Sequence, residues 1–404
     1  MQRIVITGQG AVSAFGIGAH TLWSQLREGR SGIRPLVHPQ AEHLRVCVAA
    51  QVPDFDASTH FDPKVLPLLD RFSQLAVLAA REAIRESGID FTVDDVGAQT
   101  IVTVGSAVGG ELTRDEQSRK LYQDQSPRVH PLSIPRAMIN APASHISMEH
   151  GLTGPSFAVA SACASTNHAV AQAVLALRGG VADIAVTGGT ESCFSTSNLR
   201  AWEAMRVLSD DTCRPFSRNR RGLVLAEGAA MFVLETLEHA QKRGAIILAE
   251  LAGIGMSSDA GDIVSPSDVG AARSMRLALA DARLDVTDID YINAHGTGTV
   301  ANDATETRAI RNAFGVAADR LAVSSTKSMH GHALGASGAL ELVAMIGALR
   351  EGVVPPTANY SEADPACDLD VVPNTARSIP VRAALSNSFA FGGLNATLAL
   401  RRAP

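Results

Sequence analysis

The stretch Ser156-Phe-Ala-Val-Ala-Ser-Ala-Cys163-Ala-Ser-Thr-Asn-His-Ala-Val170 leads from a strand, through a turn of small residues, into a helix. Its apolar run 157–160 predicts the strand, and the segment from Ser165 to Arg178, followed by two glycines, predicts the helix. Because this helix is apolar on nearly every side, we expect it to be buried. A strand followed by a buried helix is the unit from which layered α/β folds are built.

The same alternation continues along the whole chain. The clearest strand-like runs are 101–104, 157–160, 184–187, 246–252, 292–294 and 322–324. Segment 73–87, closed by Gly88, predicts a helix between two of them. Asp303 and Glu306 have the spacing of a capping box, which predicts a second helix that starts near Ala304 and ends at Gly315. The fold class we expect is therefore α/β.

The chain reads as one body with two related halves. No low-complexity tract or long linker divides it, and its 46% hydrophobic residues are enough for a sizeable core. A strand, a small-residue turn with a reactive side chain, and a buried helix occur around Cys163 and again around His332. We therefore expect an N-terminal half, residues 1–250, and a C-terminal half, residues 251–404.

Composition argues against several classes of protein. A formal net charge of −6 provides no general basic face, so we expect no nucleic-acid partner. Nothing approaches the ~20 apolar residues of a membrane span, and no leader-like segment precedes the first strand. The five cysteines are scattered and odd in number, as in a chain from the reducing cytoplasm.

Cys163 is the first candidate for chemistry. It lies at the start of a helix, where unpaired N–H groups and the helix dipole stabilise a thiolate. On this segment alone, a cysteine that merely fills space in the core is the more common case.

Two further turns carry histidines. The segment Asp290-Tyr-Ile-Asn-Ala-His295-Gly-Thr-Gly-Thr299 ends a strand in a histidine followed by glycines and hydroxyl residues. The segment Ser325-Thr-Lys327-Ser-Met-His-Gly-His332 carries one lysine and two histidines before an apolar helix. Either histidine turn, taken alone, is also typical of a structural histidine.

Two other kinds of site use these residue types. Zinc could be bound by His295, His330, His332 and a carboxylate, but no paired-cysteine or His-Glu-x-x-His pattern supports this, and we expect no metal among the catalytic residues. A Cys–His hydrolase needs a thiolate, one base and an orienting side chain, which leaves one histidine without a role.

These segments resemble the β-ketoacyl-(acyl carrier protein) synthases of the elongating type, in the thiolase superfamily. Two more segments contribute, Arg214-Pro-Phe-Ser-Arg-Asn-Arg-Arg-Gly-Leu-Val-Leu-Ala-Glu-Gly-Ala229 and Ser386-Asn-Ser-Phe-Ala-Phe-Gly-Gly-Leu-Asn-Ala396. The resemblance runs from Ile6 to the end of the chain. It implies two similar halves in a five-layered α-β-α-β-α fold, normally a homodimer, and a decarboxylating condensation.

The resemblance also implies roles for matching residues. Cys163 would accept an acyl chain from the phosphopantetheine of an acyl carrier protein, and His295 and His332 would promote decarboxylation of the malonyl thioester. The backbone N–H groups of Cys163 and Phe389 would form an oxyanion hole. The remaining catalytic and substrate-binding matches are a buried pair, Lys327 and Glu341, and two pantetheine contacts, Thr297 and Thr299.

Other matches concern the pocket and its surroundings. Val108 and Trp202 correspond to the acyl tunnel, and Phe391 corresponds to a gate beside the malonyl pocket. The residues that match a carrier-protein-binding rim are Arg206, Arg128 and Lys64. No covalently bound cofactor is implied, but a structural monovalent cation site resembles the set Asn293, Glu341, Ser386 and Asn387.

Some positions depart from the family pattern. Ala390 replaces a glycine of the usual Phe-Gly-Phe-Gly-Gly-Thr-Asn, Leu394 replaces its threonine, and His330 replaces a threonine near the second catalytic histidine. These changes are more typical of nodulation-type and secondary-metabolite synthases than of the housekeeping enzyme. Two alternatives are a biosynthetic thiolase, which needs a second cysteine near the C-terminus, and a non-catalytic chain-length factor in a heterodimer, which usually lacks the nucleophile.

Overall fold

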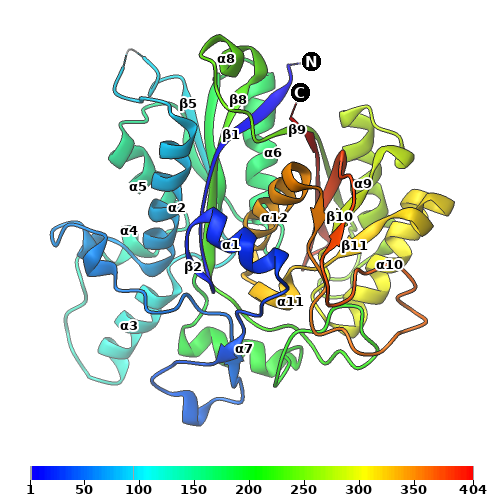
Figure 1. The fold of residues 1–404 in the computed structure, drawn as a ribbon. Coiled ribbons are helices and arrows are strands. Elements are labelled where there is room, and N and C mark those ends of the chain that lie inside the picture. The colour runs from blue at the N-terminus through cyan, green and yellow to red at the C-terminus, as the bar shows by residue number, and fades with distance from the viewer. Residues whose placement is uncertain (1, 94, 404) are drawn as a thin grey trace.

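The computed structural model describes residues 2–93 and 95–403, and its main strands fall into two sets (Figure 1). The first set consists of β1 (Ile4–Ser13), β5 (Thr100–Gly105), β6 (Ser156–Val159), β7 (Ile184–Glu191) and β8 (Gly228–Thr236). The second consists of β9 (Ala249–Ser258), β10 (Tyr291–Asn293), β11 (Ala322–Ser324), β14 (Ala383–Ala390) and β15 (Leu394–Arg402).

Both sets have the same topology. The first runs β1-β8-β7-β5-β6 and the second β9-β15-β14-β10-β11, so each follows the same order of its own strands. In both, the first two neighbouring pairs are antiparallel and the last two are parallel. Ile4–Ile6 of β1 pairs with β9 and joins the sets. The expected fold of two similar halves is confirmed, and we propose that they divide near residue 250, where β9 begins.

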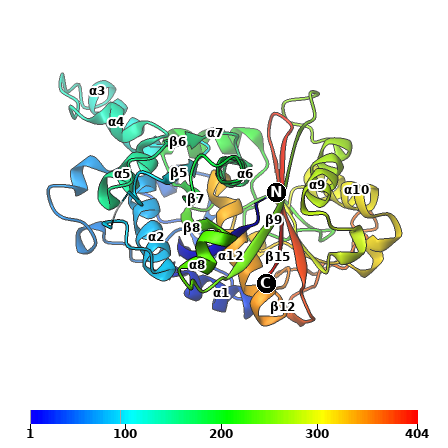
Figure 2. The same cartoon turned by 90° about the horizontal axis from the view of Figure 1, so that it is seen from above.

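Helices complete the five layers (Figures 1 and 2). The helices α2 (Arg71–Ser87) and α5 (Ala141–His150) cover the outside of the first sheet, and α9 (Asp268–Ala282) and α10 (Val300–Phe314) cover the outside of the second. Between the sheets lie α6 (Ser165–Arg178) and α12 (Ser337–Glu351), which contact each other and strands of both halves.

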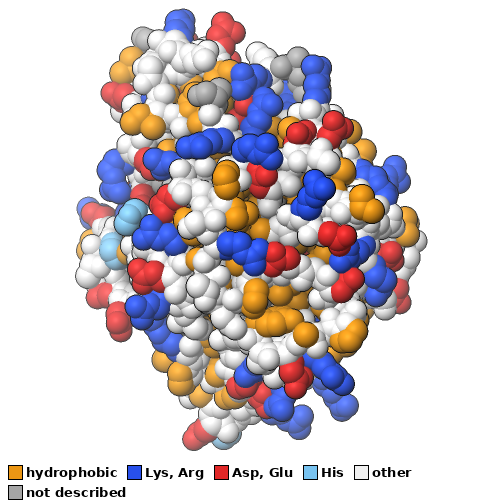
Figure 3. Space-filling model, turned by 45° about the vertical axis from the view of Figure 1, so that its right-hand side comes forward, with side chains coloured by type: hydrophobic (Ala, Val, Ile, Leu, Met, Phe, Trp, Pro, Cys, Tyr) orange, Lys and Arg blue, Asp and Glu red, His pale blue; other side chains and the backbone are white. Residues whose placement is uncertain are grey.

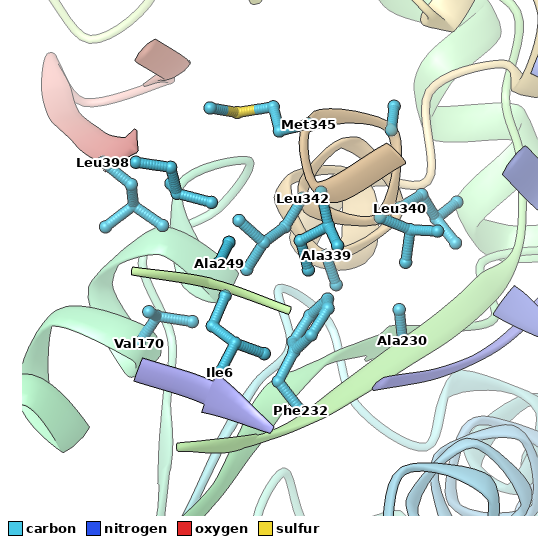
Figure 4. Packing of buried hydrophobic residues seen from close by; sticks show 14 of the residues in the cluster. Ile6, Val170, Ala230, Phe232, Ala249, Ala339, Leu340, Leu342, Met345 and Leu398 are labelled. Carbon is cyan, nitrogen blue, oxygen red and sulfur yellow. The ribbon is translucent and has the colours of Figure 1, made fainter. Parts of the chain in front are cut away.

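The helices of the central layer contribute many residues to the hydrophobic core. Every residue of α12 from Ser337 to Leu349 is buried. Figure 4 shows Leu342 and its neighbours on α12 packed around Phe232 of β8 and Ile6 of β1. Truncating a leucine in such a place to alanine costs roughly 2–5 kcal/mol of stability. The turns that precede the two central helices are therefore attached to a tightly packed core.

Some predicted helix boundaries are confirmed and others are wrong. The predicted end of α2 at Gly88 is confirmed, and this glycine has a φ of 68°. The helix starts at Arg71, two residues before the predicted Ser73, because the Asp70 carboxylate accepts the N–H of Phe72. α10 begins at Val300 rather than Ala304, with Thr299 as its N-cap. The capping-box prediction is wrong because Asp303 and Glu306 lie inside the helix, where their carboxylates accept backbone N–H groups of other segments.

The remaining elements are short or peripheral. They are α1 (Ala19–Arg27), α3 (Glu111–Tyr122), α4 (Ser133–Ala137), α7 (Thr196–Met205), α8 (Leu237–Lys242) and α11 (Lys327–His330), with the two-residue strands β2 (Gly16–Ile17), β3 (Arg34–Pro35), β4 (Val48–Ala49), β12 (Val353–Val354) and β13 (Arg377–Ser378). Among the described residues, no helix has both the length and the hydropathy of a membrane span.

Candidate active site

The repeated topology brings the two halves together at one buried centre. Cys163 lies between β6 and α6, His295 follows β10, and His332 lies between α11 and α12. The Cys163 sulfur and one ring nitrogen of each histidine lie within 4.8 Å of one another. The two imidazole rings meet edge to face, with their centroids 5.4 Å apart. Residues separated by more than a hundred positions therefore form one cluster.

The turn before α6 is strained. Ala162 has a φ of 49°, which costs a residue with a Cβ some free energy. Ser165 holds this turn, because its hydroxyl donates to the Ala162 carbonyl (2.7 Å) and accepts the Ser161 N–H (2.9 Å). The arrangement fixes the direction of the Cys163 side chain.

Burial dominates the titration of Cys163. It raises the pKa of the thiol to about 12, although the charge of Lys327 acts in the opposite direction. We expected a lowered pKa from the position at a helix start. The prediction failed because the thiol is only 7% exposed, and a thiolate there loses its hydration. In the resting site the group is a thiol, and its proton must leave when sulfur attacks.

Lys327 determines which nitrogen of His295 carries the proton. The ammonium nitrogen donates to the His295 carbonyl (2.7 Å) and lies 3.5 Å from His295 Nδ1. An ammonium has only donors, so Nδ1 must be the acceptor and Nε2 must carry the hydrogen. Glu341 neutralises Lys327 through a direct ion pair, and both side chains are fully buried. The pair thus stabilises the tautomer that can donate a hydrogen bond.

His332 is fixed by its own turn. Its Nδ1 lies 2.7 Å from the hydroxyl of Ser337, and its backbone N–H and carbonyl bind Val224 and Ala226. Burial, followed by the charge of Lys327, lowers the pKa of both His295 and His332 well below the usual value. Both imidazoles are therefore neutral near pH 7, so each can donate one hydrogen bond and accept one proton.

Among the described residues, the structure does not bring together the four zinc ligands considered above, which were three histidines and a carboxylate. His330 Nε2 lies 3.0 Å from the hydroxyl of Thr326, and the cluster contains Cys163 in place of His330.

Two carboxylates that we did not assign to the site shape the His295 turn. Glu306 accepts the N–H groups of His295 (2.8 Å) and Gly296 (2.7 Å), and burial raises its pKa to about 7. Asp303 accepts the N–H groups of Phe216 and Gly298. The sequence signal was available: both acids lie on the helix face that also carries Ile310 and Phe314, which the core buries.

An apolar pocket opens beside the cluster. Its walls include Trp202, Phe389 and Phe391, and its hydroxyl groups come from Thr297 and Thr299, which lie 2.9 Å apart. The rings of Trp202 and Phe391 stack with their centroids 6.0 Å apart. Val108 packs on the same apolar cluster as Trp202, although it does not line the pocket itself. The residues matched to a rim, Arg206, Arg128 and Lys64, are exposed and lie outside the pocket lining.

The residues matched to a cation site are all buried. Asn293 and Ser386 are direct neighbours on β10 and β14. The side-chain oxygens Asn293 Oδ1, Ser386 Oγ and Glu341 Oε2 are buried without a hydrogen-bond partner. Asn387 differs, because its amide already binds Glu306 and Thr397. A buried oxygen without a partner is costly, and a cation is one kind of group that would satisfy it.

Comparisons with known proteins agree with this geometry. Residues 1–240 match the description "Beta-ketoacyl synthase, N-terminal domain", and residues 248–361 match "Beta-ketoacyl synthase, C-terminal domain". The chain is 51% identical over 405 residues to Nodulation protein E of Rhizobium sp. (strain N33), with 99% of each chain covered. It is 38% identical over 411 residues to 3-oxoacyl-[acyl-carrier-protein] synthase 2 of Staphylococcus aureus (strain COL), covering 99% of this chain and 98% of that one.

Solved structures give the same result. The ishigamide ketosynthase/chain length factor superposes with a TM-score of 0.95 at 37% identity, and both chains are fully covered. A type II PKS acyl-carrier protein in complex with its ketosynthase bound to the hexaketide superposes with a TM-score of 0.90 at 29% identity, again over both full chains.

Proposed function

Because the chain belongs to the β-ketoacyl synthase family, it is a condensing acyltransferase that elongates acyl chains, and we propose that Cys163, His295 and His332 perform this chemistry. The observation that carries the proposal is the placement of one thiol and two neutral imidazoles within 4.8 Å of one another. A hydrolase needs one histidine, whereas a two-step condensation uses both.

In the first half-reaction, Cys163 attacks the thioester of an acyl group on carrier-bound pantetheine. A bond forms between the Cys163 sulfur and the acyl carbon while the bond between that carbon and the pantetheine sulfur breaks. The Cys163 proton is transferred to the departing pantetheine sulfur, which leaves as a thiol. The backbone N–H groups of Cys163 and Phe389 stabilise the carbonyl oxygen while it is negative.

In the second half-reaction, the Nε2–H groups of His295 and His332 donate to the thioester carbonyl of the malonyl unit. They stabilise the enolate that forms when carbon dioxide leaves. The enolate carbon attacks the acyl carbonyl, the new C–C bond forms, and Cys163 departs with the electrons of its C–S bond and takes up a proton from water to become the resting thiol. The product is a 3-oxoacyl thioester on the carrier protein. Two neutral imidazoles suit this step, because each keeps one N–H group to donate at neutral pH.

We also propose a structural monovalent cation, bound by Asn293, Ser386 and the free oxygen of Glu341. Support comes from the three orphaned oxygens described above. Such an ion would bind the Glu341 oxygen that the ion pair with Lys327 leaves without a partner.

The proposed partner is an acyl carrier protein, whose pantetheine arm would enter past Thr297 and Thr299. Basic and acidic side chains are interspersed on the face drawn in Figure 3, so docking would depend on local arginines such as Arg206 rather than on a general field. We propose a homodimer, with a heterodimer as the alternative that the ketosynthase/chain length factor structure favours. A cytoplasmic location accords with five free cysteines.

Among condensing enzymes, we favour a specialised role. Identity to Nodulation protein E is 51%, against 38% to the 3-oxoacyl synthase 2. A non-catalytic chain-length factor is disfavoured because Cys163, His295, His332 and Lys327 are all in place. A biosynthetic thiolase is disfavoured because Phe389 occupies the C-terminal motif and no cysteine does.

The test is the intact mass of the protein after incubation with a panel of acyl-carrier proteins. An adduct is expected on the wild type and not on Cys163→Ala. The acyl group that stays on Cys163 identifies the substrate. An adduct that persists in Cys163→Ala and maps to Cys193 or Cys213 would refute the assignment of the nucleophile.

A further inference from the structure

The two central helices are entered by equivalent turns. α6 starts at Ser165 and α12 at Ser337, so Cys163 and Gly335 each lie two residues before a helix start. The residues immediately before them, Ala162 and Leu334, both have left-handed backbones, with φ values of 49° and 44°. The repeat therefore places Gly335 where the other half has its nucleophile.

Glu191 binds the Gly335 turn. This residue ends β7, and its carboxylate is fully buried. One oxygen accepts the N–H groups of Ala107 (2.7 Å) and Gly335 (3.1 Å). The other accepts the hydroxyl of Ser106 (3.0 Å) and the N–H of Val108 (3.3 Å). A single side chain of the first half thus connects the loop after β5 to the turn after His332.

The repeat explains why a carboxylate belongs there. Strand β14 is the counterpart of β7, and it ends at Ala390 where β7 ends at Glu191. In the Cys163 turn, the N–H faces the place that we assign to the oxyanion of the acyl group. In the Gly335 turn, the equivalent N–H donates to the Glu191 carboxyl group. Both turns present backbone donors to an acceptor oxygen, which is the chemistry that such concave backbone sites favour.

The first half also binds the other end of the same glycine. Thr166, in the first turn of α6, donates its hydroxyl to the Gly335 carbonyl (2.5 Å). A Cβ added to Gly335 would lie 2.5 Å from the Ala107 nitrogen, so this turn has no room for a side chain. Gly335 is therefore fixed on both sides by groups of the half that carries Cys163, and His332 lies three residues away.

We propose that Glu191 is a positioning residue, which sets the His332 turn in register with Cys163 by holding Gly335 together with Thr166. The proposal rests on the proposed roles of Cys163 and His332. It extends them by naming the contact that transmits the position of one half to the catalytic histidine of the other.

The experiment measures the two half-reactions separately in Glu191→Gln. A glutamine presents an NH₂ group to two of the four donors, so the variant loses about half of these hydrogen bonds. We expect the rate of malonyl decarboxylation and condensation to fall by about 10–100-fold, while acyl transfer to Cys163 stays within about threefold of the wild type. A Michaelis constant for the acyl substrate that changes little would accompany this loss.

Glu227→Gln is the matched control. Glu227 is another buried carboxylate of the first half, but it binds Arg71, Ser192 and the N–H of Val52 rather than a catalytic turn. We expect this variant to lose stability and to keep the wild-type ratio of the two rates.

Thr166→Val provides a second variant in case Glu191→Gln does not fold, and it should lower the second half-reaction selectively. Two results overturn the proposal: equal losses in both half-reactions, or a rate ratio no different from that of Glu227→Gln. A wild-type protein that neither acylates Cys163 nor decarboxylates the malonyl thioester would refute the proposed function instead.

Discussion

His330 should make the fold sensitive to acid. The side chain is 1% exposed, its Nε2 binds Thr326, and its Nδ1 has no hydrogen-bond partner. Burial, and then the charge of Lys327, lowers the pKa of His330 from 6.5 to about 3. We consider the substitution His330→Thr, which restores the residue that the resembling family usually has and removes the titratable group.

The size of the effect follows from the two pKa values. The unfolded chain binds a proton at this histidine as the pH falls through 6.5, whereas the folded chain stays neutral until the pH approaches 3. Below pH 6.5 the unfolded state therefore holds more protons, and acid favours unfolding. Between about pH 7 and about pH 5, this residue lowers the free energy of unfolding by about 2 kcal/mol.

The assay is urea unfolding of both proteins at these two pH values. Burial raises the pKa of Glu191 and of Glu306 to about 7, which acts in the opposite direction. These two groups are common to both proteins, so the difference between wild type and variant isolates His330. We expect His330→Thr to lose about 2 kcal/mol less than the wild type on acidification. Parallel pH dependences in His330→Thr and wild type would refute the reasoning.

Four further changes test the site. Lys327→Met leaves a buried carboxylate without its cation and should cost about 3–5 kcal/mol in urea unfolding, and a loss below about 1 kcal/mol would argue against a buried ion pair. Trp202→Ala removes the ring that stacks on Phe391, so it should shift product chain length measured by mass spectrometry, whereas unchanged products with lowered stability would make Trp202 part of the core. Arg206→Glu should raise KM for carrier-bound substrate more than for a pantetheine mimic, and equal effects would remove it from the interface. Ala390→Gly should speed condensation more than acyl transfer in rapid-mixing experiments if alanine restrains the loop, and identical rates would make it a spacer.

Local patterns predicted the fold well because the fold is built from local units. The helix that begins at Ser165 and ends at Arg178 was legible from its apolar composition and the following Gly179, and the structure has it at the same residues. For α10 the predicted start was about four residues too late. Asp303 and Glu306 have the spacing of a cap, but tertiary contacts use them for the His295 turn. Spacing alone cannot distinguish a carboxylate that caps its own helix from one that binds a neighbouring turn.

The residues around the catalytic cluster were harder to foresee for a related reason. Glu191, Thr166 and Gly335 are unremarkable in the sequence, since their partners lie up to 169 positions away. The repeat nevertheless supplies a rule. Once two helices are known to start at Ser165 and Ser337, each residue of one turn has a counterpart in the other, and the nucleophile Cys163 corresponds to a glycine. A duplicated fold that needs one nucleophile must give its second turn another occupant. Here the second turn binds the buried carboxyl group of Glu191. The half without a nucleophile therefore uses this turn to hold His332 in position.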